Sequence, residues 1–474
     1  MTSAGITRRA SLSLAALFTG TLLTGTAQAD SFTLVTNGND AGQGSLRHAL
    51  QQGKTSEIFI LPTVSSIRIS TPLEYNKRNA LTILGSGQTI LTDRNITLLA
   101  INEGADVRLS DLSFKGPRGF SINNRGDVDG EAGKGIFVNV RDDQTGVVTI
   151  DLENVSVSGV ANHGVHISDC SLADNCGAGA GGAGTGSDAS IFVSVDGVTV
   201  EDVGNGTFDA DGLRVDDRSA GDIFFTASNS TFSRVGADGV ELDEGGQGQV
   251  YVDIRNSGFT DNGGYCDPEL LRPYLPVAAE GEFDESEQVT QADIPAAVDG
   301  SPDDGCFERS VELYDSGFVK EYEIALDPDD GIDLDEAGEG DLIATLKRTT
   351  ISGNRDEGMD FDESGDGSVL VRLHDTRAFD NTDDGFKTSE ADAGSVVGHL
   401  RRVVSTDNGG KGAAFEEAGS GDLDVTVIRS HTANNDDSDD TGLDIAQDDA
   451  GDGILRVRAS TITDGIDTDG VEQR

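Results

Sequence analysis

The chain contains no tryptophan, and only six tyrosines occur among its 474 residues. Carbohydrate sites commonly stack sugars on aromatic faces, so this shortage argues against an extended sugar-binding surface. Basic residues are also scarce, because 34 Lys and Arg face 85 Asp and Glu, for a formal net charge of −51. Such a charge repels nucleic acid, so we expect cations as partners and no nucleic-acid binding. A hydrated anionic surface adapted to salt water would give the same composition.

Beyond the N-terminus the sequence lacks any run of about 18 apolar residues, so it predicts no transmembrane segment. The first 29 residues have the features of a signal peptide. Arg8-Arg9 precedes an apolar stretch from Leu12 to Leu23, and Ala27-Gln28-Ala29 forms a small-residue cleavage site. We therefore expect export of residues 30–474 to the periplasm, the cell surface or the medium. The arginine pair matches only part of a twin-arginine signal, so the Sec and Tat routes both stay open.

Only four cysteines are present, and disulfides persist in exported proteins. Pairing of near neighbours predicts the disulfides Cys170–Cys176 and Cys266–Cys306, among the three connectivities that four cysteines allow. No His or further Cys lies at zinc-finger spacing beside either pair, which argues against a zinc site.

A ten-residue phrase recurs along the chain and sets the register of a repeat. Its clearest copies begin at Gly239, Gly331 and Gly358, where the last reads Gly-Met-Asp-Phe-Asp-Glu-Ser-Gly-Asp-Gly. Weaker copies begin at Gly212, Gly385, Gly412 and Gly442. From Gly331 to Gly442 the leading glycines are therefore separated by 27, 27, 27 and 30 residues. A fixed period of this length is typical of a solenoid.

Each phrase is followed by a second segment with alternating apolar residues, such as Val369-Leu-Val-Arg-Leu373, and then by a turn rich in Asn, Asp and Gly. Alternation with a period of two predicts strands. Strands of about five residues without intervening helices cannot form βαβ units, so their parallel stacking must come from coiling. The sequence therefore predicts an all-β fold, a right-handed parallel β-helix with coils of about 27 residues, as a single domain over residues 30–474.

Short N-terminal motifs also resemble a known family. Thr33-Leu-Val-Thr-Asn37 leading into Gly42-Gln-Gly-Ser-Leu-Arg-His-Ala-Leu50 resembles a motif of bacterial surface β-helix proteins of the polymorphic outer-membrane type. Leu81-Thr-Ile-Leu-Gly-Ser-Gly87 and Val107-Arg-Leu-Ser-Asp-Leu-Ser113 are similar to early coils of the pectin-lyase-like superfamily. The resemblance implies a β-helix in an exported setting, and it does not imply a particular reaction.

Three segments depart from the repeat. We expect an N-terminal cap over residues 30–56, approximately. Within it, Ser45 to Gln52 should form a short helix that covers the open end of the first coil. A Gly-rich insertion is expected over about 168–188. A longer insertion over about 263–310 contains five of the nine prolines, and the alternation of Val311-Glu312-Leu313 predicts that the coil resumes there.

The sixth position of the phrase predicts a column of carboxylates at strand spacing. Its members are Asp217, Glu244, Glu336, Glu363, Glu390, Glu417 and Gln447. Like charges about 5 Å apart repel unless hydrogen-bond donors or cations offset the repulsion. Either each side chain accepts N–H groups of the following glycine turn, or Ca²⁺ bridges neighbouring coils. On the second interpretation the metal ligands are Glu244, Glu336, Glu363, Glu390 and Glu417.

Catalytic candidates are few. Pectin-degrading hydrolases of the superfamily carry Asn-Thr-Asp and Asp-Asp motifs, and Asn381-Thr-Asp383-Asp384 is superficially similar, although the remaining motifs are missing or out of order. Lyases and epimerases of the fold use Lys or Arg beside carboxylate-bound Ca²⁺, which singles out Lys387 in a mainly acidic column. A cross-coil ion pair of Lys387 with Asp360 explains the same residue without catalysis.

Two functional interpretations follow. The first is a non-catalytic surface or extracellular module that binds cations, a polysaccharide or another surface protein. The second is a polysaccharide-degrading lyase or glycoside hydrolase, with Lys387, Asp383 and Asp384 as catalytic candidates. The aromatic shortage and the negative charge favour the first.

Overall fold

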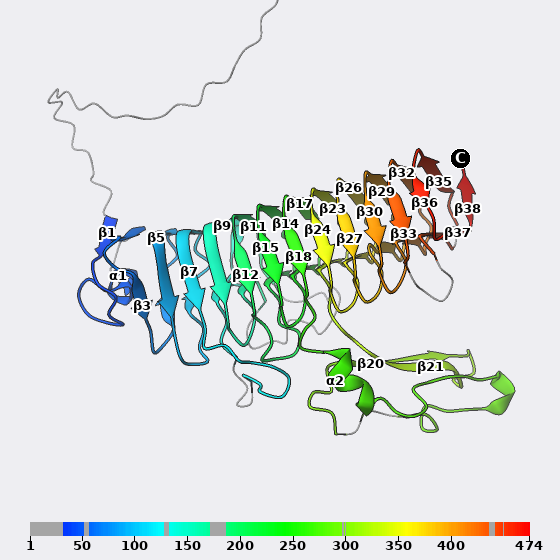
Figure 1. The fold of residues 1–474 in the computed structure, drawn as a ribbon, viewed down its shortest axis with the longest axis horizontal. Coiled ribbons are helices and arrows are strands. Elements are labelled where there is room, and N and C mark those ends of the chain that lie inside the picture. The colour runs from blue at the N-terminus through cyan, green and yellow to red at the C-terminus, as the bar shows by residue number, and fades with distance from the viewer. Residues whose placement is uncertain are drawn as a thin grey trace, which may run out of the picture. The chain divides into compact units, whose positions relative to one another are not determined.

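Successive repeats form the coils of a parallel β-helix, in which each strand stacks on its counterpart in the next coil (Figure 1). The computed structural model describes residues 32–51, 56–127, 132–170, 186–295, 298, 300–435, 441–448 and 450–474, within a unit that spans Phe32–Arg474. The predicted parallel β-helix is confirmed. The predicted signal peptide and Cys176 lie outside the described residues. None of the described helices is long and apolar enough to cross a bilayer.

One wall of the β-helix is a twelve-stranded parallel sheet, which contains the phrase repeats. Its strands are β4 (Leu73–Tyr75), β6 (Leu99–Ile101), β8 (Ile136–Asn139), β10 (Val165–Ser168), β13 (Leu213–Asp217), β16 (Val240–Glu244), β22 (Ile332–Glu336), β25 (Met359–Glu363), β28 (Ser389–Glu390), β31 (Ala413–Glu417), β34 (Leu443–Gln447) and β37 (Ile466–Asp469). The register is constant, so equivalent residues of the phrase lie directly above one another.

The other walls belong to a 23-stranded sheet with two rows. The first row contains β1 (Phe32–Val35), β2 (Glu57–Ile60), β5 (Leu81–Leu91), β7 (Val107–Lys115), β9 (Thr145–Ser158), β11 (Asp188–Asp196), β14 (Ile223–Ser228), β17 (Val250–Arg255), β23 (Leu342–Lys347), β26 (Val369–His374), β29 (Val396–Arg401), β32 (Leu423–Ile428), β35 (Gly453–Arg458) and β38 (Val471–Gln473). The second row contains β3 (Ser66–Arg68), β12 (Thr199–Glu201), β15 (Thr231–Ser233), β18 (Gly258–Thr260), β24 (Thr350–Ser352), β27 (Arg377–Phe379), β30 (Val404–Thr406), β33 (His431–Ala433) and β36 (Thr461–Ile462). The long strands β5, β7 and β9 run through both rows.

Left-handed backbone residues form the corner between the two rows. Asn229 and Asn256 have φ of 52°, and Asp375 has φ of 56° at the same corner of a later coil. Asn and Asp tolerate this conformation better than most side chains because their short polar groups bond locally. Asn and Asp thus occupy this corner in some coils, whereas Arg348, Arg402 and Arg429 adopt the same conformation there in others.

The core is the stack of inward-pointing side chains. Leu242, Leu334 and Phe361 pair in register on successive coils of the twelve-stranded sheet, and each is fully buried. Alternation along each strand sends the intervening residues outward. A shift of one residue would reverse the two faces, so the apolar pattern fixes the register.

A short helix lies at the N-terminal end, within the range where the sequence predicts a cap. Helix α1 (Leu46–Gln51) lies within the predicted helix, and it buries Leu46, Ala49 and Leu50. Residues 52–55 lie outside the described residues. The helix contacts β1, β2 and β4, so it shields the first strands of the solenoid.

The long insertion extends further than the sequence predicts. Strand β20 (Phe307–Leu313) pairs antiparallel with β21 (Val319–Leu326), which also pairs with β19 (Glu280–Glu282). Val311–Leu313 thus belongs to a hairpin of the insertion, and the coil resumes at β22. The prediction that the coil resumes at Val311 is wrong because alternation specifies a strand and not its partner. The insertion also contains α2 (Pro268–Leu271) and two 3₁₀ turns, η1 (Arg272–Tyr274) and η2 (Glu285–Glu287).

A disulfide closes the insertion on itself, and a small apolar cluster and an ion pair attach it to an earlier coil. Cys266 and Cys306 are bonded as predicted. They pack in a buried cluster with Tyr265, Leu271 and Ile122, and Ile122 belongs to an earlier coil. Arg125 Nη1 lies 2.9 Å from an Asp303 carboxylate oxygen of the insertion.

Only one cysteine of the second predicted disulfide, Cys170–Cys176, belongs to the described residues. Cys170 is disulfide-bonded, and its predicted partner, Cys176, is not among the described residues. The predicted insertion over about 168–188 is likewise described only up to residue 170 and from residue 186 onward.

We expect the β-helix to fold without the long insertion. A Cβ placed on Gly263 would lie 2.6 Å from the carbonyl oxygen of Asp329, so the two ends of the insertion are adjacent. Replacing residues 266–327 by a short Gly-Ser linker should leave the far-ultraviolet circular dichroism per residue of the solenoid unchanged. Loss of the β-sheet signal in this variant would show that the insertion is part of the folding core.

Candidate functional site

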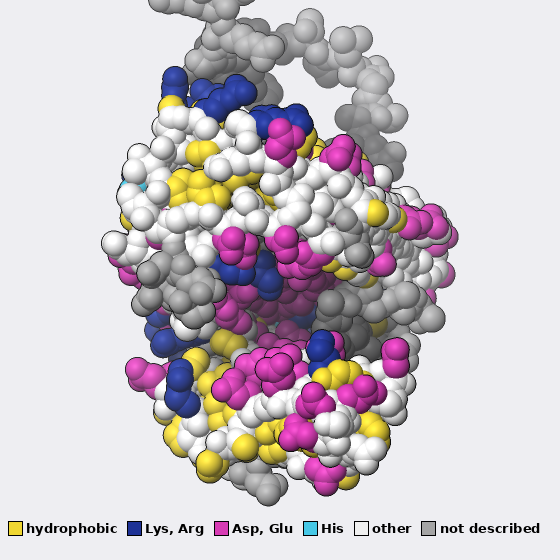
Figure 2. Space-filling view, turned by 90° about the vertical axis from the view of Figure 1, so that its right-hand side faces the viewer, with side chains coloured by type: hydrophobic (Ala, Val, Ile, Leu, Met, Phe, Trp, Pro, Cys, Tyr) yellow, Lys and Arg dark blue, Asp and Glu magenta, His cyan; other side chains and the backbone are white. Residues whose placement is uncertain are grey.

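The outer face of the twelve-stranded sheet is strongly acidic, and we call it the acidic face. Its outward side chains on β13 to β25 are Arg214, Asp216, Glu241, Asp243, Asp333, Asp335, Asp360 and Asp362. Several of these carboxyl groups are buried although they point away from the core, among them Asp216, Asp243 and Asp335. In the space-filling view, Asp and Glu side chains gather around a hollow that also contains Lys and Arg side chains (Figure 2). Buried charges of one sign require compensation.

The predicted glutamate column lies at the carboxyl end of these strands, and it caps the glycine turns. Glu244 Oε1 accepts the N–H of Gly248 at 3.1 Å, and Glu363 Oε1 accepts the N–H of Gly367 at 3.1 Å. The same bond recurs at the other three glutamates, from Gly340 to Glu336, from Gly394 to Glu390 and from Gly421 to Glu417. Capping of this kind is the first of the two predicted interpretations, and bridging by Ca²⁺ remains a prediction.

The second oxygen of three of the five capping glutamates has a different environment. Oε2 of Glu336, Glu363 and Glu390 is buried without a hydrogen-bond donor. Burial, together with the neighbouring carboxyls of the column, raises the pKa of Glu336 to about 10 and that of Glu363 to about 8. A protonated carboxyl can donate to the free oxygen of its neighbour, so we expect shared protons to stabilise the column where no cation is bound.

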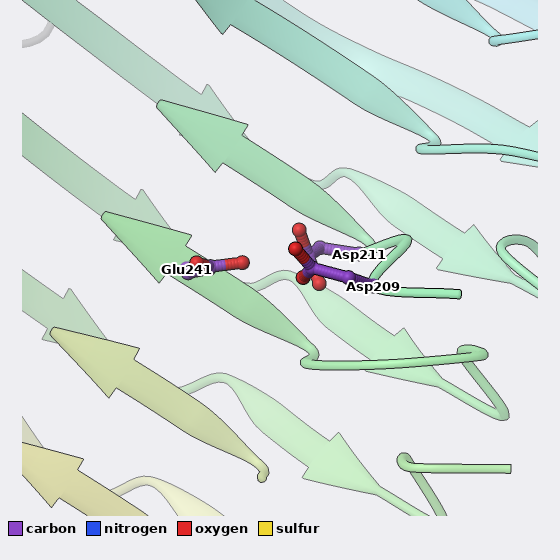
Figure 3. Close-up of side chains that lie close together, drawn as sticks. All are labelled: Asp209, Asp211 and Glu241. Carbon is purple, nitrogen blue, oxygen red and sulfur yellow. The ribbon is translucent and has the colours of Figure 1, made fainter. Parts of the chain in front are cut away.

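Near the start of the strands, a buried arginine neutralises a first cluster of carboxylates. Oxygens of Asp209, Asp211 and Glu241 all lie within 4.8 Å of one another. Asp209 and Asp211 come from the turn before β13, and Glu241 comes from β16 (Figure 3). Arg214 Nη1 donates to all three, at 3.0 Å to Asp209 and 3.3 Å to Asp211. The guanidinium therefore already occupies the place of a cation in this cluster.

Two histidines and a lysine adjoin the arginine, and the sequence analysis missed this group. His166 Nε2 lies 2.7 Å from Asp216 Oδ2, and the His163 ring lies 4.4 Å from the His166 ring between centroids. Lys134 Nζ contacts His166 Nδ1. The alignment of Gly135, Gly164 and Gly212 as leading glycines would have placed these residues on neighbouring coils.

A second carboxylate cluster lacks an arginine. Oxygens of Asp330, Asp356 and Glu357 lie within 4.8 Å of one another. Asp330 is 8% exposed, and its Oδ1 has no hydrogen-bond partner among the described residues. Burial and the nearby Glu357 raise the pKa of Asp330 well above its usual range. Burial and Glu357 also raise the pKa of Asp356 to about 10.

Lys387 is the basic residue beside this second cluster. Its Nζ lies 3.1 Å from Glu357 Oε1 and 2.6 Å from Asp360 Oδ2, so the predicted cross-coil ion pair with Asp360 is confirmed. Burial and the adjacent Asp362 nevertheless raise the pKa of Asp360 to about 7. Of four neighbouring carboxyl groups, counting Asp330 and Asp356, the Lys387 ammonium thus has ion pairs within 4.0 Å with Glu357 and Asp360.

The three predicted catalytic candidates line one cavity of about 280 Å³. Its walls are Glu357, Asp383, Asp384, Lys387, Thr388, Ser389, Lys411, Ala414 and Glu416. Burial raises the pKa of Asp384 to about 7, against the opposing hydrogen bond from the Lys411 N–H. Glu357 belongs to both the cavity and the second cluster, so the cavity opens directly beside the uncompensated carboxylates.

The hydrolase-like string of the sequence has a structural role at its first residue. Asn381 belongs to a buried ladder in which the Asn354 amide donates to Asn381 at 2.9 Å, and Asn381 donates to Asn408 at 2.9 Å. The ladder continues from Asn408 to Asn435 at 2.8 Å. Asn381 therefore holds the coils together and does not face the cavity.

Comparison with known proteins gives fold-level similarity alone. No protein-family model matches the chain, and no curated protein matches it. Among solved structures, ORF18 of Geobacillus virus E2 is 10% identical with a TM-score of 0.36, over 93% of this chain and 60% of that one. The A-module of the Azotobacter vinelandii mannuronan C-5 epimerase AlgE6 is 9% identical with a TM-score of 0.27, over 90% and 92%. This chain therefore spans about 60% of the length of the phage protein, and the site must be argued from its own geometry.

We expect the glutamate column to make the protein less stable at alkaline pH when divalent cations are removed. A raised carboxyl pKa means that the folded protein binds the proton more tightly than the unfolded chain, in which Glu titrates near about 4.3. This stabilisation is complete below that pH, and it is lost as the pH rises through the folded values of about 8 for Glu363 and about 10 for Glu336. Melting temperatures in EDTA should therefore fall between pH 6 and pH 10.

The variant Glu336→Gln isolates this effect, because the amide keeps a donor and an acceptor but cannot ionise. Its melting temperature should fall less steeply with pH than that of the wild type. Glu339→Gln, at an exposed position of the same turn, is the matched control and should follow the wild type. Equal slopes for Glu336→Gln and the wild type would contradict proton sharing in the column.

Proposed function

We propose that the protein is an exported β-helix binding module whose acidic face holds a divalent cation at Asp330, Asp356 and Glu357. One observation carries the proposal. Three carboxylates converge within 4.8 Å, and the buried Asp330 Oδ1 has no hydrogen-bond partner among the described residues. An unpaired buried carboxylate oxygen costs several kcal/mol unless a proton or a cation satisfies it.

The first carboxylate cluster serves as an internal comparison. There Arg214 donates to Asp209, Asp211 and Glu241, so the positive charge is supplied by the chain. In the second cluster the ion pairs of Lys387 within 4.0 Å include Glu357 and do not include Asp330 or Asp356. A bound cation would perform at the second cluster what the guanidinium performs at the first.

The donor set favours a hard cation. Carboxylate oxygens are preferred by Ca²⁺ and Mg²⁺, and the absence of a thiolate or imidazole from the cluster disfavours softer metals. Ca²⁺ is the better choice because it accepts irregular arrangements of six to eight oxygens, whereas Mg²⁺ demands near-octahedral geometry.

A surface or extracellular setting fits this role. The N-terminal sequence resembles bacterial surface β-helix proteins, the first 29 residues have signal-peptide features, and the net charge is −51. We therefore propose that the module is periplasmic, attached to the cell surface or secreted, and that it contacts a polysaccharide or another surface protein through bound cations.

A second candidate function is polysaccharide cleavage, and the cavity of about 280 Å³ is the observation that favours it. The cavity brings Lys387 together with Asp384, whose pKa burial raises to about 7. A carboxyl group that titrates near neutral pH can act as a general acid or base. A cation at Asp330, Asp356 and Glu357 would lie beside this cavity and could neutralise an anionic sugar.

Calcium binding is tested with Asp330→Asn. In EDTA the variant should melt at a higher temperature than the wild type at pH 8, because the neutral amide avoids both the buried charge and the proton uptake that the raised pKa of Asp330 imposes on folding. Isothermal titration with Ca²⁺ should show at least about a tenfold loss of affinity, since one ligand of the cation is gone. Affinity of the wild type should rise with pH as Asp356 and Asp360 lose their protons.

Asp366→Asn is the matched control, because it removes the same charge from an exposed turn of the neighbouring coil. It should retain the wild-type affinity for Ca²⁺. The proposal fails if Ca²⁺ stabilises the wild type no more than a matched ionic strength of NaCl does, or if Asp330→Asn binds Ca²⁺ as tightly as the wild type.

The two candidate functions are separated by incubating the protein with neutral and anionic polysaccharides, with and without Ca²⁺. A binding module should release neither unsaturated nor reducing ends. Release that falls by at least about a hundredfold in Lys387→Met would instead establish the enzymatic alternative, because that change removes the amine from the cavity. Lys347→Met, on β23 of the 23-stranded sheet, is the control for the loss of a lysine charge.

A further inference from the structure

Lys134, His166 and Asp216 form a continuous hydrogen-bonded row across three coils. Lys134 lies just before β8, His166 lies on β10 and Asp216 lies on β13, and these strands are neighbours in the twelve-stranded sheet. Lys134 Nζ contacts His166 Nδ1, and His166 Nε2 lies 2.7 Å from Asp216 Oδ2. The row is separate from the second carboxylate cluster and from the cavity that contains Lys387.

The row fixes the tautomer of His166. Although burial alone would raise the pKa of Asp216, Arg214 and His166 hold it well below its usual range, so this carboxylate accepts a hydrogen bond. The proton of the neutral imidazole therefore resides on Nε2, and Nδ1 is left as an acceptor that faces Lys134. Arg214 Nε donates to the other oxygen of Asp216 at 2.9 Å, which keeps the carboxylate in place.

The lysine at the end of the row is a weak base. Burial lowers the pKa of Lys134 to about 8, and the nearby Arg214 acts in the same direction, while Asp216 and Asp211 oppose it. His163 and His166, from β10 and the turn before it, also lie near the amine. Burial lowers the pKa of both histidines well below the usual value. The histidines are thus neutral where the amine titrates.

The arrangement has the roles of an activated nucleophile. A neutral amine is nucleophilic, and a base that is itself oriented by a carboxylate can take the proton that the amine loses on attack. Lys134 is partly exposed, whereas His166 and Asp216 are buried. Lys134 is thus the member of the row with part of its surface open to a small molecule, while the two groups that orient its amine are buried.

We propose that Lys134 is a reactive amine that condenses reversibly with small neutral aldehydes. The nitrogen lone pair forms a bond to the carbonyl carbon, and the proton released from nitrogen passes through His166 Nδ1 to the carbonyl oxygen. The carbinolamine then loses water and leaves an imine, so one aldehyde and one amine give one imine and one water. A neutral substrate is required because Asp209, Asp211 and Glu241 surround the neighbouring Arg214 and repel anions.

The test is trapping of the imine in the folded full-length protein. The wild type is treated with limiting glycolaldehyde and sodium cyanoborohydride between pH 6 and pH 9, and the modified lysines are quantified by peptide mass spectrometry. Lys134 should react at least about ten times faster than the exposed Lys115 at pH 7.5, because a far larger fraction of its amine is neutral. The pH dependence of its rate should have a midpoint near 8.

Two variants separate activation from simple exposure. Asp216→Asn offers His166 an amide donor, which favours the tautomer with the proton on Nδ1 and removes the acceptor that faces Lys134. His166→Asn removes the imidazole and leaves Asp216 bound to Arg214, so it serves if Asp216→Asn fails to fold. In either folded variant the rate at Lys134 should fall towards that at Lys115, while Lys115 reacts as before.

The inference is overturned if Lys134 in the folded wild type reacts no faster than Lys115. It is equally overturned if the rate at Lys134 is unchanged in folded His166→Asn, since His166 would then have no part in the reactivity. Circular dichroism of each variant establishes that the comparison is made between folded proteins.

Discussion

Axial stacking of identical positions is the constraint on which this structure depends. Neighbouring coils are spaced by the hydrogen bonds between parallel strands, about 4.8 Å apart, and equivalent residues of the repeat lie directly above one another. A side chain must therefore tolerate a copy of itself as its neighbour. Leu, Val and Phe do so readily, and Asn does so by donating from one amide to the next, as Asn354 does to Asn381. A carboxylate cannot do so without a proton, a donor or a cation.

The structure shows two ways in which the protein offsets the stacking of carboxylates. The glutamate column uses turn N–H groups, and the raised pKa values of Glu336 and Glu363 favour shared protons between its carboxyls. The first cluster uses Arg214, whose planar guanidinium has enough donors to serve several carboxylates at once. At Asp330, Asp356 and Glu357 the described residues supply one ion pair, from Lys387 to Glu357, and this difference is the basis for proposing a cation there.

The fold was predictable from the sequence because the period, the alternation and the glycine turns all specify the same coil. The same register predicted the column of Glu244 and its equivalents, with capping as one of two alternatives, and the pair of Lys387 with Asp360, whereas the Cys266–Cys306 disulfide followed from the pairing of near neighbours. The end of the insertion was not predicted correctly, because the alternating pattern of Val311–Leu313 fits a strand of an antiparallel hairpin as well as a strand of a coil. The group around Arg214 was missed because its residues lie in coils interrupted by the insertion near Cys170, where the repeat is hardest to align.

The Asn ladder and the parallel sheets have a mechanical consequence. The hydrogen bonds between coils connect one coil to the next, so tension applied between the two ends of the solenoid would load the bonds of the terminal coil before those of the interior. Extension would then proceed by unzipping, and each released repeat of 27 residues would lengthen the chain by on the order of 90 Å. Under tension such a rod would yield stepwise and dissipate energy with every coil, in contrast to a globular domain that ruptures once.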